Sequence, residues 1–157
     1  MSSKYEEAIK ACKVSEDDAQ VKEAVAQIME KHFEANKTQE VYKFLFNTID
    51  LTTLNSTDSS QSVARFVERV NDFDNEYPQL KNVAAICVYP CFVQVVRSVL
   101  EVSDVEVAAV SAGFPSSQTF PEVKTIETSL AVSDGADERD IVFNLGNYYD
   151  GDYEAVA

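Results

Sequence analysis

The chain has 157 residues, and its 13 Lys and Arg residues against 27 Asp and Glu residues give a formal net charge of −14. Phosphate backbones are held by clustered Lys and Arg side chains, so this charge argues against a nucleic-acid-binding protein. Hydrophobic residues make up 45% of the chain, which is enough for a packed core and predicts a globular fold of about one domain.

Rare residue types exclude further classes of site. The four glycines all lie beyond residue 112, too few and too dispersed for a glycine-rich phosphate loop. A single histidine excludes a metal site with several histidine ligands, and the three cysteines have no CxxC spacing. Because the sequence has no apolar leader and no long apolar run, we expect a reduced, cytoplasmic protein without an export signal or a membrane span.

The first part of the chain is helical in character. Residues 4–47 contain neither glycine nor proline, and apolar residues such as Val21, Val25 and Ile28 recur at helical spacing. We therefore expect residues 1–46 to form an N-terminal helical extension, followed by a second region over residues 47–157.

That second region alternates between short apolar runs and helical stripes. Four runs predict strands, namely TIDLTTLNSTD from Thr48, residues 82–89, residues 105–110 and residues 140–145. Three stripes between them predict helices, over residues 59–76, 92–100 and 123–134. This alternation predicts right-handed parallel βαβ units, hence an α/β fold in which the loops after the strands carry functional residues. Gly151 and Asp152 are typical of the opening of a fifth unit, so we expect a truncated domain.

Two carboxylates fall within the predicted strands. Asp50 and Asp140 are flanked by Ile, Leu, Val and Phe, and a carboxylate in a buried strand is costly unless it faces a polar interior or a cation. We interpret both as functional candidates. Asp137 and Glu138 precede the last predicted strand and are interpreted as a solvated turn, and Cys87 as a small buried residue.

Four segments, in their order and spacing, closely resemble the first four strands of deoxyribose-phosphate aldolases, which are class I aldolases with a (β/α)8 TIM barrel. These segments are TIDLTTLNSTD, NVAAICVYP, VSAGFPSSQT and GADERDIVFNLG, and the resemblance runs from about Asn47 to Glu154. It implies an incomplete barrel of about four βα units, preceded by N-terminal helices. It also implies reversible cleavage of 2-deoxy-D-ribose 5-phosphate to acetaldehyde and D-glyceraldehyde 3-phosphate, through a lysine Schiff base and without a metal or other cofactor.

The resemblance also implies roles for individual residues. Asp140 matches the family's fourth-strand aspartate, which acts in the proton relay at the Schiff-base centre. Asp50 matches the first-strand aspartate of the polar active-site network. Thr52 and Cys87 match positions that face the same substrate cavity.

The family's Schiff-base lysine, its second lysine and its phosphate loops lie on later strands than these four. A Schiff-base lysine must be desolvated or close to another cation to be a free amine near neutral pH. All nine lysines of this sequence fall on polar or helical segments, at positions 4, 10, 13, 22, 31, 37, 43, 81 and 124. We therefore expect no Schiff-base lysine in this chain, and no aldolase activity from the chain alone.

Two other functions stay open. Four parallel strands leave open edges and an uncovered inner face, so the chain could be a non-catalytic half-barrel that self-associates or pairs with a complementary chain. Alternatively, the acidic clusters could form a divalent-cation site in an unrelated α/β enzyme.

Overall fold

The computed structural model describes residues 4–12 and 17–156. The chain divides into two compact units, one over Lys43–Phe143 and one made of Met1–Tyr42 with Asn144–Ala157. The predicted boundary between residues 46 and 47 stays a prediction. Within the described ranges, no helix combines the length and the apolar character needed to cross a bilayer.

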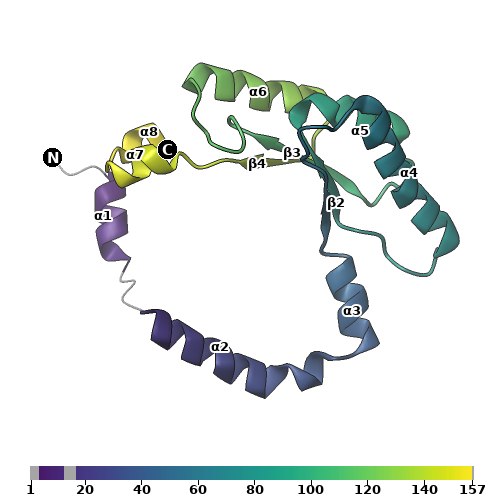
Figure 1. Ribbon diagram of the computed structural model, residues 1–157, viewed down its shortest axis with the longest axis horizontal. Coiled ribbons are helices and arrows are strands. Elements are labelled where there is room, and N and C mark those ends of the chain that lie inside the picture. Colours follow the sequence, from purple (N-terminus) through teal and green to yellow (C-terminus); the bar gives the residue numbers. More distant parts are fainter. Residues whose placement is uncertain (1–3, 13–16, 157) are drawn as a thin grey trace. The chain divides into compact units, whose positions relative to one another are not determined.

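The unit over residues 43–143 is built on one parallel sheet with the strand order β1-β2-β3-β4, as the alternation of runs predicts. Helices follow the strands in the order expected of successive βα units (Figure 1). The elements are β1 (Asp50–Thr52), α4 (Ser60–Glu76), β2 (Ala85–Val88), the 3-10 helix η2 (Pro90–Phe92), α5 (Val93–Val99), β3 (Glu106–Ser111), α6 (Pro121–Ser133) and β4 (Glu138–Ile141).

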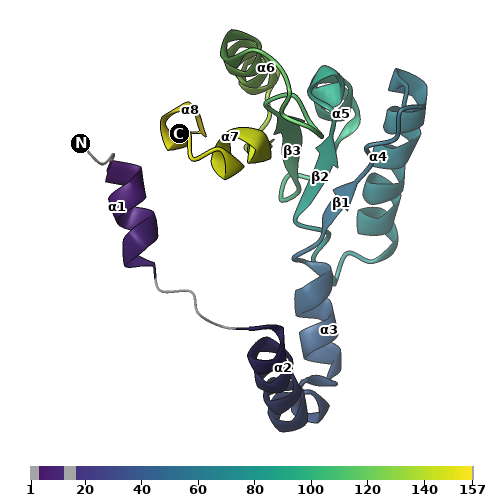
Figure 2. The same ribbon diagram turned by 60° about the vertical axis from the view of Figure 1, so that its left-hand side comes forward.

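The two faces of this sheet differ in what covers them. Helices α4, α5 and α6 line up along one face, the helix-covered face (Figure 2). Strand residues such as Ile86 and Val107 are fully buried there, in one cluster with Val63 and Val67 of α4 and Val96 of α5. The opposite face, the open face, carries a smaller cluster made of Ala85, Cys87, Ala108 and Val110. Because side chains alternate along a strand, every second residue of β2 and β3 belongs to the open face.

Polar side chains cap α4 and connect it to the segment that leads into β2. Ser59 caps α4 through a reciprocal pair of hydrogen bonds with Ser62. Asn82, only 2% exposed, donates from Nδ2 to the Val70 carbonyl of α4 at 3.0 Å and accepts from the Val83 N–H at 2.9 Å. These bonds set α4 against the segment that leads into β2.

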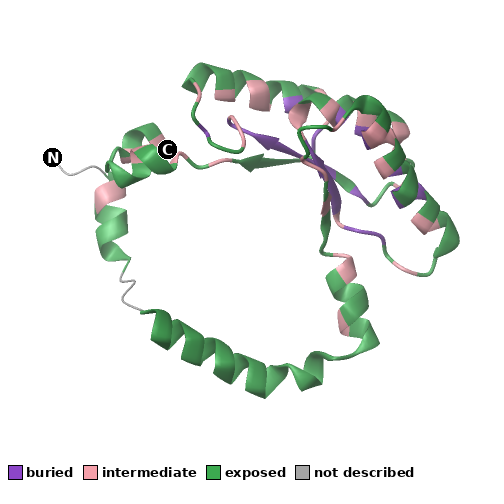
Figure 3. Cartoon of the chain, viewed as in Figure 1, coloured by how far each residue is buried: buried purple, intermediate pink, exposed green. Residues whose placement is uncertain are grey.

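The second unit is described by itself. It contains α1 (Lys4–Ala11), α2 (Asp18–His32), the 3-10 helix η1 (Glu34–Asn36), the first half of α3 (Gln39–Phe46), α7 (Leu145–Tyr149) and α8 (Tyr153–Val156). None of these helices has a buried residue within the described part of the chain, and α2 is exposed along its whole length (Figure 3). The helical character predicted for residues 1–46 is confirmed for the described residues.

The fourth strand lies earlier than predicted. We expected it over residues 140–145, but β4 spans Glu138–Ile141 and pairs with β3 from Ala108 to Ser111. Helix α7 begins at Leu145, and Asn144 caps it by accepting from the Asn147 N–H at 3.1 Å. The apolar run therefore extends past the strand because its last residue opens the next helix.

Asp137 and Glu138 are both exposed, as expected of a solvated turn, but the assignment to a turn was wrong for Glu138. Glu138 is the first residue of β4. The Asp137 carboxylate accepts from the Val107 N–H at 2.8 Å and pairs with the Arg97 guanidinium of α5. Burial acts to raise the pKa of Asp137, but these two partners hold it below its ordinary value. Asp137 thus ties α5 to β3 ahead of β4.

Candidate functional site

The predicted site residues come together on the open face of the sheet. Thr52 pairs with Cys87 in register, and Asp50 lies two residues before Thr52 on the same strand. Paired residues of neighbouring parallel strands point to the same side, so Asp50, Thr52 and Cys87 share this face. Asp140 pairs with Val110, which lies in the same open-face cluster as Cys87. Three strands therefore position the four side chains.

A side-chain hydrogen bond joins the Cys87 thiol of β2 to the Asp140 carboxylate of β4. Cys87 Sγ lies 3.7 Å from Asp140 Oδ2, across the intervening strand β3. The small Ala108, which is fully buried, occupies the position of β3 that pairs with Cys87. A larger side chain there would separate the thiol from the carboxylate.

The environment of Cys87 raises the pKa of its thiol to about 11. Burial is the largest cause, followed by the negative charge of Asp140, and the Asp50 charge acts in the same direction. A hydrogen bond with Thr52 acts in the opposite direction. The thiol is therefore protonated at neutral pH, where it serves as a hydrogen-bond donor to Asp140 and is a poor nucleophile.

The strands that carry the two aspartates were expected to be buried, and this expectation was wrong. Asp50 and Asp140 are both exposed, and every residue of β4 is exposed. The reason is topological: β1 and β4 are the outermost strands of the sheet, and within the unit over residues 43–143 the helices α4, α5 and α6 lie along the opposite face (Figure 2). Both carboxylates are thus accessible from the open side of the sheet.

Two acidic residues of this region were missed by sequence reasoning. Burial is the largest cause that raises the pKa of Glu138, and the charges of Glu106, Asp50 and Asp140 act in the same direction. Glu138 precedes Asp140 by two residues, so the two-residue period of a strand could have identified it. The position of Glu106 opposite Ala85 depends on the strand register, which the sequence alone does not show. Within the described ranges, no group of three or more His, Cys, Asp or Glu residues is placed to hold a metal ion.

The described lysines all lie in helices or loops, as expected. Lys124 of α6 is the lysine bound to the loop that follows β3, where its Nζ donates to Ser117 Oγ at 2.8 Å. Lys13 lies outside the described residues. No described lysine therefore lies within a strand of the sheet.

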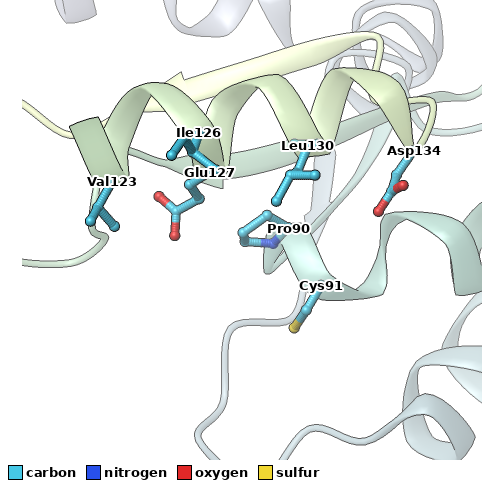
Figure 4. A pocket seen from close by; sticks show the side chains of 8 residues that line it. Pro90, Cys91, Val123, Ile126, Glu127, Leu130 and Asp134 are labelled. Carbon is cyan, nitrogen blue, oxygen red and sulfur yellow. The ribbon is translucent and has the colours of Figure 1, made fainter. Parts of the chain in front are cut away.

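An apolar groove of about 430 Å³ lies elsewhere, between α6 and the 3-10 helix η2. Val123, Ile126 and Leu130 of α6 face Pro90 and Cys91 across it (Figure 4). None of the four predicted site residues lines this groove. The groove and the open face are thus separate features.

Comparisons with known proteins point to one family. No family model matches the chain. A deoxyribose-phosphate aldolase of Streptococcus uberis is 47% identical over 73 residues, which cover 46% of this chain and 33% of that protein. Another, of Metamycoplasma hominis, is 34% identical over 108 residues, which cover 69% of this chain and 46% of that protein.

A solved structure supports the same relationship. The structure named QR15, an aldolase, aligns with a TM-score of 0.60 and 30% identity, over 71% of this chain and 45% of that one. This chain thus spans less than half the length of each of these relatives. The resemblance seen in the four sequence segments is confirmed, and the chain is related to the deoxyribose-phosphate aldolases, with a partial TIM-barrel-like α/β fold that is consistent with their N-terminal half.

Proposed function

We propose that this chain supplies the acid-base part of a deoxyribose-phosphate aldolase site. The observation that carries the proposal is the convergence of Asp50, Thr52, Cys87 and Asp140, from three strands, on the open face of the sheet. The substrate is 2-deoxy-D-ribose 5-phosphate and the products are acetaldehyde and D-glyceraldehyde 3-phosphate. The reaction belongs to the breakdown of deoxyribose phosphate in the cytoplasm.

Each residue has a role that its position supports. Asp140 is exposed on the open face, where its carboxylate can accept and return a proton next to a Schiff base. Cys87 donates to Asp140 Oδ2 and so orients that carboxyl group. Asp50 and Thr52, two residues apart on β1, provide hydrogen-bonding groups for the polar substrate.

We do not assign the amine that forms the Schiff base to any of these 157 residues. A lysine nucleophile needs a desolvated or cationic environment beside the relay carboxylate, and the described lysines lie in helices or loops. The amine and the phosphate-binding groups then come from residues other than these. On this basis the chain alone has no aldolase activity.

A trapping experiment tests this division of roles. The chain is incubated with acetaldehyde and borohydride, which reduces a Schiff base to a stable ethylated lysine, and the products are located by mass spectrometry. A matched chimaera carries residues 47–143 of this chain in place of the matching stretch of the Metamycoplasma hominis relative. We expect no specific adduct on the chain alone, and one adduct in the chimaera, on a lysine from the relative. A specific adduct on a lysine of this chain would contradict the proposal.

A second candidate function is that of an assembly partner. β1 pairs only with β2, and β4 only with β3, within the described residues. Unpaired edges and exposed apolar residues such as Ile141, 66% exposed, favour association with another chain or a second copy. Sedimentation velocity at micromolar concentration tests this function. We expect self-association, and a sharp monomer boundary would contradict it.

A further inference from the structure

The end of β4 is held more firmly than its position at the edge of the sheet implies. The strand has four residues, all of them exposed, and edge segments of this kind tend to open locally. Val142 directly follows β4, and both its backbone N–H and its backbone carbonyl are hydrogen-bonded. Its N–H donates to the Ser111 carbonyl of β3 at 3.2 Å, and its carbonyl accepts from Ser117 Oγ at 3.0 Å.

Ser117 is an unusual residue for a surface loop. It lies in the loop between β3 and α6, it is fully buried, and its backbone has a positive φ of 58°. The Ser117 N–H donates to the Gly113 carbonyl at 2.9 Å, which closes a turn and aims the hydroxyl group at Val142. The loop therefore presents one hydroxyl group to the end of β4.

Lys124 fixes the direction of that hydroxyl group. Lys124 Nζ, from the first turn of α6, donates to Ser117 Oγ at 2.8 Å. A hydroxyl group has one proton to donate, so an ammonium group that occupies a lone pair leaves the proton for the Val142 carbonyl. One turn along α6, Glu127 Oε2 accepts from the Gly113 N–H at 2.9 Å and holds the start of the same loop.

We propose that Ser117 and Lys124 are positioning residues, which hold the end of β4 and thereby keep the Asp140 carboxylate over the open face. Asp140 lies two residues before Val142, so fraying of the strand end would move Asp140 away from Cys87. The inference deepens the proposed function, because Asp140 is the proposed relay residue. Its test reads the position of Asp140 through the Cys87 thiol and requires no aldolase chemistry.

The Cys87 thiol is the reporter for this test. The charged groups that act on it are Asp140 of β4 and Asp50 of β1, and both raise its pKa. Cys12 and Cys91 are exposed and are replaced by Ser, so that the full-length chain keeps Cys87 alone. Because Cys87 is buried, its thiol pKa is read from the carbon-13 chemical shift of its Cβ, followed by NMR against pH, which needs no reagent to reach the thiol.

We expect Lys124→Met to lower the thiol pKa by about half a pH unit or more, because Asp140 moves away. Ser117→Ala should do the same, and Lys124→Arg, which keeps a donor, should leave the pKa unchanged. The sign excludes a direct charge effect, since loss of a cation near a thiol would raise its pKa. In an Asp140→Asn background, Lys124→Met should have no further effect. An unchanged or raised pKa in Lys124→Met, or an equal fall in both backgrounds, would overturn the inference.

Discussion

The two faces of the four-stranded sheet are made by alternate residues of the same strands, yet they have different roles. On the helix-covered face, Ile86 and Val107 pack in a continuous apolar core with α4, α5 and α6. On the open face, small residues such as Ala85 and Ala108 leave room beside Asp50 and Asp140. The comparison teaches that the apolar core lies on one side of the sheet, whereas the residues of the proposed site lie on the other.

The largest expected difference in unfolding free energy is between the same substitution made on a buried strand and on an exposed strand. Ile86 is fully buried in β2, so Ile86→Ala should lower the free energy of unfolding by about 3 kcal/mol, through lost burial and a cavity. Ile141 of β4 is 66% exposed, so Ile141→Ala should cost less than about 1 kcal/mol. Urea unfolding followed by circular dichroism measures both, and equal losses would contradict the difference between the two positions.

The junction of α4 with β2 should show a smaller but clear effect. Asn82→Ala removes the bonds to the Val70 carbonyl and the Val83 N–H in a buried site. Leaving buried groups unsatisfied should cost about 2 kcal/mol of unfolding free energy. Asn75→Ala, at an exposed position of α4, is the matched control and should be close to neutral in the same urea experiment. A loss for Asn82→Ala no larger than that of the control would contradict this role.

On the open face, the Cys87 thiol should make the free energy of unfolding depend on pH. The Cys87 thiol has its pKa raised from 9.0 to about 11, so between these pH values the unfolded chain loses the proton before the folded chain does. Ionisation then favours the unfolded state, so the free energy of unfolding should fall by up to about 1.4 kcal/mol for each pH unit in this range. Well below pH 9 the thiol is protonated in both states, and its contribution is constant. Cys87→Ala should lose this part of the slope. Parallel stability curves for the two proteins over this range would contradict the raised pKa.

Much of the fold could be predicted from the sequence because its signals are local. The continuous apolar run around Ile86 and the stripe of Val63 and Val67 each identify one element without knowledge of its neighbours. The end of β4 could not be predicted in this way. Its bounds depend on pairing with β3, and the apolar residues that follow lead into α7.

The candidate site was predicted in part for the same reason. Asp50 and Asp140 were identified because carboxylates stand out within apolar runs. Glu106 was missed because only the register with β2 shows which open-face residues it joins. The contact of Lys124 with Ser117 depends on a positive φ at a residue that is not glycine, which the sequence does not indicate.

The most direct test of the central claim is the aldolase activity of the chimaera with the Metamycoplasma hominis relative. We expect the chimaera to cleave 2-deoxy-D-ribose 5-phosphate, and Asp140→Asn to lower its kcat/KM by roughly 100-fold or more, as loss of a general acid-base group does. Asp72→Asn, at an exposed position of α4, is the control and should leave kcat/KM unchanged. A folded chimaera without activity, or one in which Asp140→Asn behaves like Asp72→Asn, would contradict the claim that the open face carries the acid-base part of an aldolase site.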